Sequence, residues 1–357
     1  MLKSPSGKRP TTPSPSDRSV VTLHDVALRA GVSPMTVSNV INGKTTVRPD
    51  ARKRVLDAID ATGYRVNLLA RALAGGRTRL ISVFSPQLNR PYATEVVHGA
   101  SMAAEALNYD LVVMMLSEKN ATDLSIMTQL SIGALLIQPT SHGTWSRVSL
   151  PEHVISVDGP GQQVFSVDNY GGATLAMRHL IELGHTRIGC ITGLEGERQL
   201  PSGRLLSPPY DRDDAAERLR AYRDCMENAG LDVPRDYVQH GNYRQASGAV
   251  AARRLLDLST PPTALFVSGD AMALGAIHVA QDRGLLVPRD LSVIGFDDLP
   301  IAAASRPGLT TIRQPLQRMG EVAVQLLVAL AEGQVQTAAG RPPFPTELVQ
   351  RESTARR

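Results

Sequence analysis

Two hydrophobic periods divide this chain of 357 residues. From residue 22 to residue 61, apolar side chains recur every three or four positions, which is the period of an amphipathic helix. From Leu80 onward, short apolar runs alternate with helical patterns, and this order is typical of a parallel sheet covered by helices on both faces. The pattern predicts a small all-α head, residues 21–65, and an α/β body, residues 80–357, made of two similar lobes with a cleft between them.

The first helix expected in the head covers residues 23–30. Thr22 can cap it, and Asp25, three positions later, completes a capping box. Gly31 supplies the left-handed residue that ends the helix. Ala27 is small enough to let a second helix approach closely.

Ser33 and Pro34 predict a second helix that runs to about Ile41, because serine is a good N-cap and proline suits the first helical position. Val37 and Val40 then face the first helix. The spacing of these apolar positions around a glycine turn is typical of a helix-turn-helix, whose second helix enters the major groove of DNA.

A third helix is expected over residues 49–61 and closes a small core. Val55, Leu56 and Ile59 should point inward. Its basic side chains should point outward; they are Arg52, Lys53 and Arg54.

Residues 66–79 form the expected hinge and linker. Asn67 can cap a helix over residues 68–73, which Gly75 and Gly76 end. Isolated helices shorter than about 12 residues are unstable in water, so we expect this one to fold only against a partner copy or DNA.

The body shows seven apolar runs of strand length. They cover residues 80–84, 110–116, 133–138, 153–158, 187–192, 263–269 and 291–297. Helices are expected at about 94–107 and 170–183. Each strand ends at a turn where a ligand can bind, as in other open α/β sheets.

Composition narrows the class of protein. Hydrophobic residues make up 42% of the chain, and no run of about 18 apolar residues offers a membrane span. Residues 1–20 lack the apolar segment of a secretory signal, so we expect a disordered tail on a cytoplasmic, nucleoid-associated protein. Cys190 and Cys225 have no metal-binding spacing and are expected to be buried thiols.

Charge is distributed unevenly along the chain. Residues 1–79 carry 14 Lys and Arg against 5 Asp and Glu, a net charge of +9, whereas the remainder carries 24 against 29, a net charge of −5. A basic head on an acidic body is the expected pattern for a nucleic-acid-binding protein, although a charged tail that is merely solvated would also be basic.

The head sequence VTLHDVALRAGVSPMTVSNVING, followed by a Tyr-x-x-Asn and ARALAGGRT, resembles the lactose/galactose repressor (LacI) family of bacterial transcriptional regulators. The resemblance extends over essentially the whole chain from about residue 20. It implies a helix-turn-helix head joined by a hinge helix to a periplasmic-binding-protein-like domain. Two positions depart from the family pattern: Val66 replaces its usual proline, and Arg48 replaces a common serine, where it would contact phosphate instead of capping.

The resemblance assigns roles in the head by position. Base reading falls on Pro34, Met35 and Asn39, and phosphate contact on Thr22, Ser33, Thr36, Ser38 and Asn42. Met35 offers an apolar contact to a thymine methyl, and Asn39 suits the N6/N7 edge of adenine. Leu73, with Ala70 beside it, falls where the family inserts a leucine into the minor groove. The alternatives are a solvated helix face and a hinge leucine that packs only on its dimer mate.

The resemblance also places an effector site at the strand ends. The residues it implies there are Tyr92, Gln138, Asp158, Arg218, Asp270 and Asp297. An arginine fork with carboxylates suits a polyol, because every hydroxyl both donates and accepts a hydrogen bond. Gly269 stands where the family more often has asparagine, which removes one amide contact. Arg218 and Asp297 could instead form a salt bridge between lobe elements, and Tyr92 and Trp145, expected in loops, could stack on a sugar or simply pack.

Two other classes of protein fit parts of the chain. An enzyme is disfavoured because Val164 replaces the third glycine of a dinucleotide fingerprint begun by Gly159 and Gly161, and neither GxxxxGK[ST] nor GxSxG occurs. A secreted sugar-binding protein would need no basic head. We therefore expect no catalytic residue, metal or cofactor.

The resemblance implies a homodimer on pseudo-palindromic double-stranded operator DNA, released by a small sugar effector. A purine or nucleoside that promotes binding is the alternative. Residues 194–213 form a long connection beside the expected cleft, either a lid over a bulky effector or an idle surface excursion.

Overall fold

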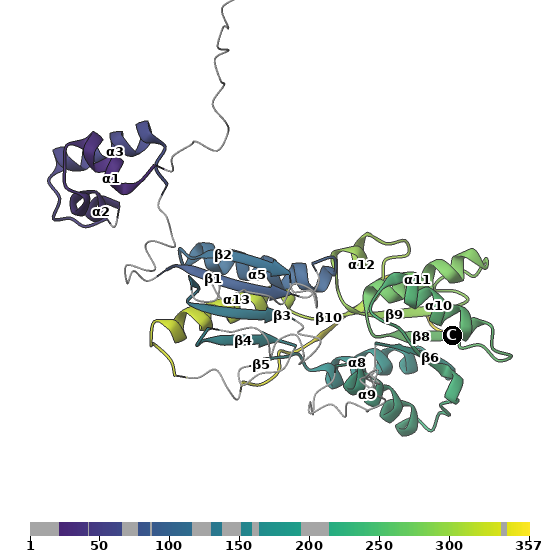
Figure 1. Cartoon of the computed structure of the whole chain (residues 1–357). Helices are drawn as coiled ribbons and strands as arrows, with labels where there is room; N and C mark the ends of the chain where they lie inside the picture. Colours follow the sequence, from purple (N-terminus) through teal and green to yellow (C-terminus); the bar gives the residue numbers. More distant parts are fainter. Residues whose placement is uncertain are drawn as a thin grey trace, which may run out of the picture. The chain divides into compact units, whose positions relative to one another are not determined.

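The computed structural model describes residues 21–41, 43–65, 78–85, 88–115, 130–137, 151–158, 164–193, 214–336 and 341–357. The chain divides into two compact units, Met1–Thr78 and Arg79–Arg357 (Figure 1). We call them the head and the body.

The head contains three helices, α1 (Leu23–Ala30), α2 (Pro34–Ile41) and α3 (Pro49–Thr62). The start and stop signals expected for α1 are confirmed. Thr22 and Asp25 form the capping box of α1, and Gly31 ends it with φ 64°. The buried core is built from small side chains: Val26, Ala27, Ala30, Val37, Val40, Val55 and Ala58.

The inward orientation expected for Leu56 of α3 is wrong. Leu56 is 49% exposed, and Ala58 is buried in its place beside Val55. Positions three and four after Val55 share its face of the helix, whereas the next residue is turned away by about 100°. Arg52 is only partly exposed, because its guanidinium donates to the backbone oxygen of Lys44 at 2.6 Å.

The first lobe of the body holds a parallel five-stranded sheet. Its strands are β1 (Leu80–Ser85), β2 (Asp110–Met115), β3 (Gly133–Ile137), β4 (Val154–Val157) and β5 (Val164–Phe165), in the order β2-β1-β3-β4-β5. Helices α5 (Pro91–Ala106) and α13 (Leu316–Ala331) pack together and share the main core of this lobe (Figure 1).

The second lobe holds a six-stranded sheet in the order β11-β10-β9-β8-β6-β7. Its strands are β6 (Ile188–Thr192), β7 (Val238–His240), β8 (Ala264–Val267), β9 (Ser292–Asp297), β10 (Thr310–Arg313) and β11 (Glu347–Val349), and β11 is antiparallel to β10. Helices α8 (Asn169–Glu182) and α9 (Asp214–Asn228) pack on one face of the sheet. Helices α10 (Gln245–Leu256) and α11 (Asp270–Asp282) cover the other, with the short η1 (Arg235–Tyr237) and α12 (Pro300–Ala304) completing the lobe. The expected two-lobed α/β architecture is confirmed.

The lobes are not consecutive halves of the chain. The backbone passes from the first to the second between β5 and α8, returns between β10 and α13, and passes again between α13 and β11. Two of these passages lie side by side: Val167 pairs with Phe344, and the rings of Phe165 and Phe344 meet edge to face at 5.7 Å.

Helices α5 and α13 approach so closely that glycines are required. A β-carbon on Gly99 would lie 1.8 Å from the backbone oxygen of Gln317, and one on Gly320 would lie 2.0 Å from that of Val96. Any larger residue at either position would force the helices apart.

Several expected boundaries shift by one to three residues. Helix α5 begins at Pro91 instead of residue 94, since proline suits the first turn of a helix, and this places Tyr92 in that turn instead of in a loop. Helix α8 begins at Asn169, capped by Asp168 through the backbone N–H of Gly171 at 2.8 Å. Cys190 is buried as expected, but Cys225 is only partly buried.

Among the described residues, no helix is both long enough and apolar enough to cross a membrane.

Candidate DNA-binding head and effector cleft

Helix α2 has one face in the head core and another open to solvent. Val37 and Val40 are buried, whereas Met35 is 69% exposed. Pro34 is exposed and Asn39 half-buried. The side chains expected to read bases therefore lie outside the head core.

Hydroxyl groups gather at the start of α2. The backbone N–H of Thr36 donates to Ser33 Oγ at 3.2 Å, and the two hydroxyls lie 2.9 Å apart. This pair caps the helix and places hydroxyl groups beside its N-terminus, which favours negatively charged groups such as phosphate. Ser38 is half-buried two positions later.

Thr22 is already engaged inside the head. Its hydroxyl donates to Asp25 Oδ2 at 2.7 Å, and its backbone N–H donates to the same oxygen at 2.8 Å. These bonds from Thr22, the backbone one first, lower the pKa of Asp25. A phosphate contact by this hydroxyl would compete with the capping box. Asn42, Ala70 and Leu73 lie outside the described residues.

In the body, Arg218 is the arginine expected to meet a ligand, and it is deeply buried. It projects from α9 with 3% exposure. Its Nε donates to Asn169 Oδ1 at 2.8 Å, its Nη1 donates to the backbone oxygen of Ser268 at 2.8 Å, and its guanidinium carbon lies 3.7 Å from the centre of the Phe296 ring. The guanidinium is thus fixed in position by an amide, a carbonyl and an aromatic face.

Asp158 follows strand β4 of the first lobe and has a left-handed backbone, φ 49°. Its Oδ2 accepts a hydrogen bond from the Tyr92 hydroxyl, while its buried Oδ1 has no hydrogen-bond partner in the described part of the chain. Burial raises the pKa of Asp158 well above its usual range, Asp214 raises it further, and the Tyr92 bond and Arg218 oppose the shift. Since Asp214 and Arg218 belong to the second lobe, this group of side chains spans both lobes.

Asp297 ends strand β9 with an unusual backbone, φ 120°. Its Oδ1 accepts a hydrogen bond of 2.5 Å from Gln314 Nε2. Burial raises its pKa to about 7, Arg218 and Gln314 act in the opposite direction, and Asp214 adds to the rise. Asp158, Arg218 and Asp297 therefore come together, as expected, from β4, α9 and β9.

Asp270 is placed differently from these residues. It is fully buried, and both of its oxygens bond within the second lobe, one to the backbone N–H of Leu299 at 2.8 Å and the other to the Thr311 hydroxyl at 2.6 Å. A β-carbon on Gly295 would lie 2.3 Å from this carboxylate. These contacts fix the local backbone and leave the Asp270 carboxylate little capacity for a ligand.

Several residues around Asp158, Arg218 and Asp297, where the cleft is expected, were not anticipated. Asp214 lies one helical turn before Arg218 on α9, and its Oδ1 accepts from Asn169 Nδ2 at 2.8 Å. Ser268 and Gln314 each follow a strand, so the strand-end rule applied throughout the second sheet would have identified them. Asn169, at the start of α8 just after a passage between lobes, left no signal in the sequence.

Tyr243 was also missed. Its ring lies close to Gly269, the position where the family more often has an asparagine. A β-carbon on Gly269 would lie 3.3 Å from the Tyr243 ring, and one on Gly193 would lie 2.1 Å from its hydroxyl oxygen. The tyrosine ring thus lies over both glycines. Gln138 and Trp145 lie outside the described residues.

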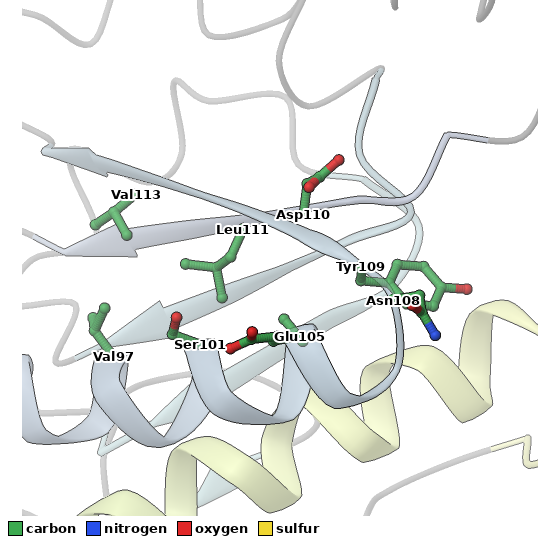
Figure 2. Close-up of a pocket in the computed structure, with 9 residues that line it drawn as sticks. Val97, Ser101, Glu105, Asn108, Tyr109, Asp110, Leu111 and Val113 are labelled. Carbon is green, nitrogen blue, oxygen red and sulfur yellow. The ribbon is translucent and has the colours of Figure 1, made fainter.

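An open groove lies elsewhere, between α5 and β2 of the first lobe (Figure 2). Val97, Ser101 and Glu105 line it from the helix, and Leu111 and Val113 from the strand. It shares no residue with the cleft, and β2 is the edge strand of its sheet.

Comparisons with known proteins agree with this two-part arrangement. Residues 22–67 match the model of bacterial regulatory proteins of the lacI family, and residues 177–354 match the periplasmic binding protein-like domain. Catabolite control protein A of Priestia megaterium is 32% identical over 86% of this chain and 91% of its own length. The transcriptional repressor CytR of Escherichia coli K12 is 33% identical over 93% and 96%.

Solved structures extend the likeness to the fold. A lac repressor dimer bound to operator and the anti-inducer ONPF has a TM-score of 0.78 at 28% identity, over 94% of this chain and all of that one. A complex of the transcriptional regulator CelR with cellobiose has a TM-score of 0.65 at 30% identity, over 93% and 99%. With its helix-turn-helix head and two-lobed body, the chain belongs to the LacI family of DNA-binding transcriptional regulators.

Proposed function

We propose that the protein is a repressor that binds a pseudo-palindromic operator as a homodimer and leaves it when a small carbohydrate binds the cleft. The observation that carries this proposal is the set of buried polar atoms at the cleft that lack hydrogen-bond partners within the described residues: Asp158 Oδ1, Ser268 Oγ and Gln314 Oε1. Buried polar groups are rarely left unbonded, so these atoms favour a polar ligand.

A carbohydrate fits the chemistry of the cleft. Carboxylate and amide oxygens accept hydrogen bonds from hydroxyls, while the Arg218 guanidinium donates to them. The Arg218 guanidinium already covers the face of the Phe296 ring, so that face is not open to a sugar. The Tyr92 and Tyr243 rings are therefore the better candidates for stacking on a sugar. We propose Tyr92, Asp158, Arg218 and Asp297 as effector contacts, together with Gln138.

In the head, we propose that Pro34, Met35 and Asn39 meet base edges. Ser33, Thr36, Ser38 and Asn42 would bind phosphates, with a weaker contribution from Thr22 because of its cap. The hinge residues Ala70 and Leu73 would enter the minor groove and bend the operator.

We propose that two copies pair along the first lobe. Strand β2 is an edge strand, and Met102 of α5 and Met115 of β2 are 59% and 60% exposed. Exposed methionines on α5 and β2, the two elements that also line the groove of Figure 2, make this a suitable dimer surface. The lac repressor that the chain resembles is described as a dimer on its operator.

Coupling between effector and operator would run through the passages between lobes. An effector that contacts Asp158 in one lobe and Arg218 in the other binds the closed arrangement better than an open one, and this difference in affinity is what shifts a conformational equilibrium. Because it acts on the chromosome, we place the protein in the cytoplasm, and we assign it no catalytic activity.

The test is to select genomic fragments bound by the purified chain and then screen sugars and nucleosides for a change in affinity for those fragments. Release by a sugar is the expected result, and Arg218→Met should abolish that release. If a nucleoside instead tightens binding of the chain to these fragments, the protein is a repressor with a nucleoside corepressor and not a repressor released by a sugar. If the chain prefers no fragment over random competitor DNA, the proposal that it binds a specific operator is wrong.

A further inference from the structure

Two aspartates follow one another at the end of β9, and both have an unusual backbone. Asp297 has φ 120° and Asp298 has φ 56°. Residues that carry a side chain rarely adopt a positive φ, and they keep it only where the surrounding structure holds them. The contacts of the two carboxylates differ, and they show what holds this turn.

Asp297 lies among the residues of the cleft. Its Oδ1 accepts a hydrogen bond from Gln314 Nε2 at 2.5 Å. Its Oδ2 lies 3.7 Å from the point where a β-carbon on Gly269 would stand, and the same point lies 3.3 Å from the Tyr243 ring. The Asp297 carboxylate is therefore beside the end of β8, the strand next to β9.

Asp298 has different partners. Its Oδ2 accepts a hydrogen bond from Arg313 Nε at 2.6 Å, and its Oδ1 lies 2.7 Å from Arg351 Nη2. Its side chain is only 7% exposed. A buried carboxylate between two guanidinium groups is fixed in place, because moving it away would leave buried charges unpaired.

Both arginines are anchored in the second sheet. Arg313 stands opposite Asp297 in the register of β9 and β10, and its Nη1 donates to Glu347 of β11 at 2.7 Å. Arg351 donates through its Nη1 to the backbone oxygen of Leu309 at 2.8 Å. Asp298 is thereby tied to β10 and to the segment that follows β11.

Adjacent residues at the end of β10 hold adjacent residues at the end of β9. Arg313 binds Asp298, and Gln314 binds Asp297. The Arg313 side chain is 47% exposed whereas Gln314 is 4% exposed, so the two side chains leave the backbone in different directions. If the arginines released Asp298, the turn would lose the contacts that hold its positive φ values, and its relaxation would draw Asp297 away from Gln314.

We propose that Arg313 and Arg351 are positioning residues of the effector site: by binding Asp298, they hold the backbone turn that presents Asp297 to the cleft. Neither arginine is among the proposed effector contacts, so both act through the turn. This inference rests on the proposed effector function of Asp297.

Titration of Asp297 reports where its carboxyl lies. Burial raises its pKa to about 7, and Arg218 and Gln314 act in the opposite direction. A carboxyl that leaves this site regains water, and its pKa returns toward the ordinary 3.8. The titratable and charged groups that influence Asp297, or are influenced by it, come from both lobes: Arg218, Asp214, Asp270, Asp158 and Tyr92.

The experiment measures the unfolding free energy of the body, in the full chain, between about pH 4 and pH 8. The quantity compared is the difference between each protein and the same protein carrying Asp297→Asn. With no other change, this difference should have a midpoint near pH 7. The double variant Arg313→Gln/Arg351→Gln should lower the midpoint by about one pH unit or more, because Asp297 then leaves its buried place.

Two further double variants separate position from charge. Arg289→Gln/Arg318→Gln removes the same two charges from exposed ion pairs, with Asp290 at 3.0 Å and with Glu321 at 2.6 Å, and should leave the midpoint unchanged. Arg313→Lys/Arg351→Lys keeps both charges at the turn and should return the midpoint to near pH 7.

Each other outcome has a defined meaning. A midpoint that stays near pH 7 in Arg313→Gln/Arg351→Gln overturns the inference, since the arginines then only stabilise the sheet. An equal shift in the exposed double variant also overturns it, as does the lack of any midpoint in the otherwise unchanged protein. If the double variant fails to fold, as judged by circular dichroism, Arg313→Gln and Arg318→Gln are compared as single changes.

The pH measurement needs neither sugar nor DNA, so it separates this inference from the proposed function. A lowered midpoint without operator release by any sugar keeps the positioning of Asp297 and contradicts the proposed function. Operator release by a sugar, with an unchanged midpoint, does the reverse.

Discussion

The head and the cleft place their functional groups in opposite surroundings. On α2, the side chains proposed to meet DNA lie toward solvent, and a separate set, Val37 and Val40, packs the core. In the cleft, the proposed ligand groups Arg218 and Asp297 are buried and bond to the lobes that hold them. Recognition and stability are therefore separable in the head and coupled in the cleft.

The largest effect expected is from a charge placed in the head core. Val55→Asp buries an unpaired carboxylate at a fully buried position and should unfold the head, with a loss of operator affinity of more than a hundredfold. Leu56→Asp, at the adjacent exposed residue, should leave the helical signal and the affinity within about twofold. Circular dichroism measures the helical signal and operator titration measures the affinity, and similar losses from the two variants would contradict the packing of α3.

In the cleft, Arg218→Met should cost both stability and response. Removing a buried cation leaves neighbouring carboxylates uncompensated, a change that typically destabilises by about 3–5 kcal/mol. Denaturant unfolding of the body measures this. Arg220→Met is the matched control on the same helix, since Arg220 is exposed and its guanidinium carbon lies 4.7 Å from the centre of the Tyr170 ring. An equal cost at both positions would argue against coupling in the cleft.

The Asp297 carboxyl gives a dependence on pH with a defined sign. Its pKa is raised to about 7 in the folded body from an ordinary value of 3.8, so the folded state retains a proton that the unfolded chain has released. The stability from this proton is fully present below about pH 4 and is lost as pH rises through about 7.

The variant Asp297→Asn has no carboxyl to ionise at this position. The free energy of unfolding of the wild-type chain, measured relative to that of this variant, should therefore fall by a few kcal/mol between about pH 4 and pH 8. Carboxyls with a lowered pKa, such as Asp290 and Glu321, are present in both proteins and cancel in the difference. If the difference in unfolding free energy between the two proteins stays constant over this range, the pKa of Asp297 is not raised in the folded body.

The smallest effect tests whether head recognition is separate from stability. Met35→Ala should weaken operator binding by about tenfold, the order expected for one good base contact, with no change in melting temperature. Leu28→Ala removes an apolar side chain from α1 that has the same 69% exposure. It should change neither quantity, and a similar loss of affinity from both would argue against a specific base contact by Met35.

The same contrast explains what the sequence could predict. Both ends of α1 and the start of α2 were predicted to the residue, because Thr22, Gly31, Ser33 and Pro34 are local signals that act within one turn. Leu56 was placed wrongly because hydrophobicity alone was used where the helical phase decides. The start of α5 was predicted three residues too late, because the preference of Pro91 for the first turn of a helix was overlooked.

The cleft was predictable only in part. Asp158, Arg218 and Asp297 follow from the strand-end rule and the family pattern, but that rule also selected Asp270, whose oxygens bond within its own lobe. Whether a polar strand-end residue faces a ligand or its own backbone depends on neighbours such as Leu299 and Thr311, and no periodicity reveals them. Asp214 was missed because it acts on a residue of the other lobe: its charge further raises the pKa of Asp158, and no local pattern shows that the two residues are neighbours.

The late return of the chain to the first lobe has a consequence during synthesis. Strands β1 and β3 leave the ribosome early, yet α13, which covers them together with α5, ends only at Ala331. At about 5–20 residues per second, the interval between β3 and α13 is on the order of 10–40 s. Throughout that interval Leu135 and Ile137 lack the helix that later buries them, so we expect the nascent first lobe to be a chaperone client whose capture ends when α13 emerges.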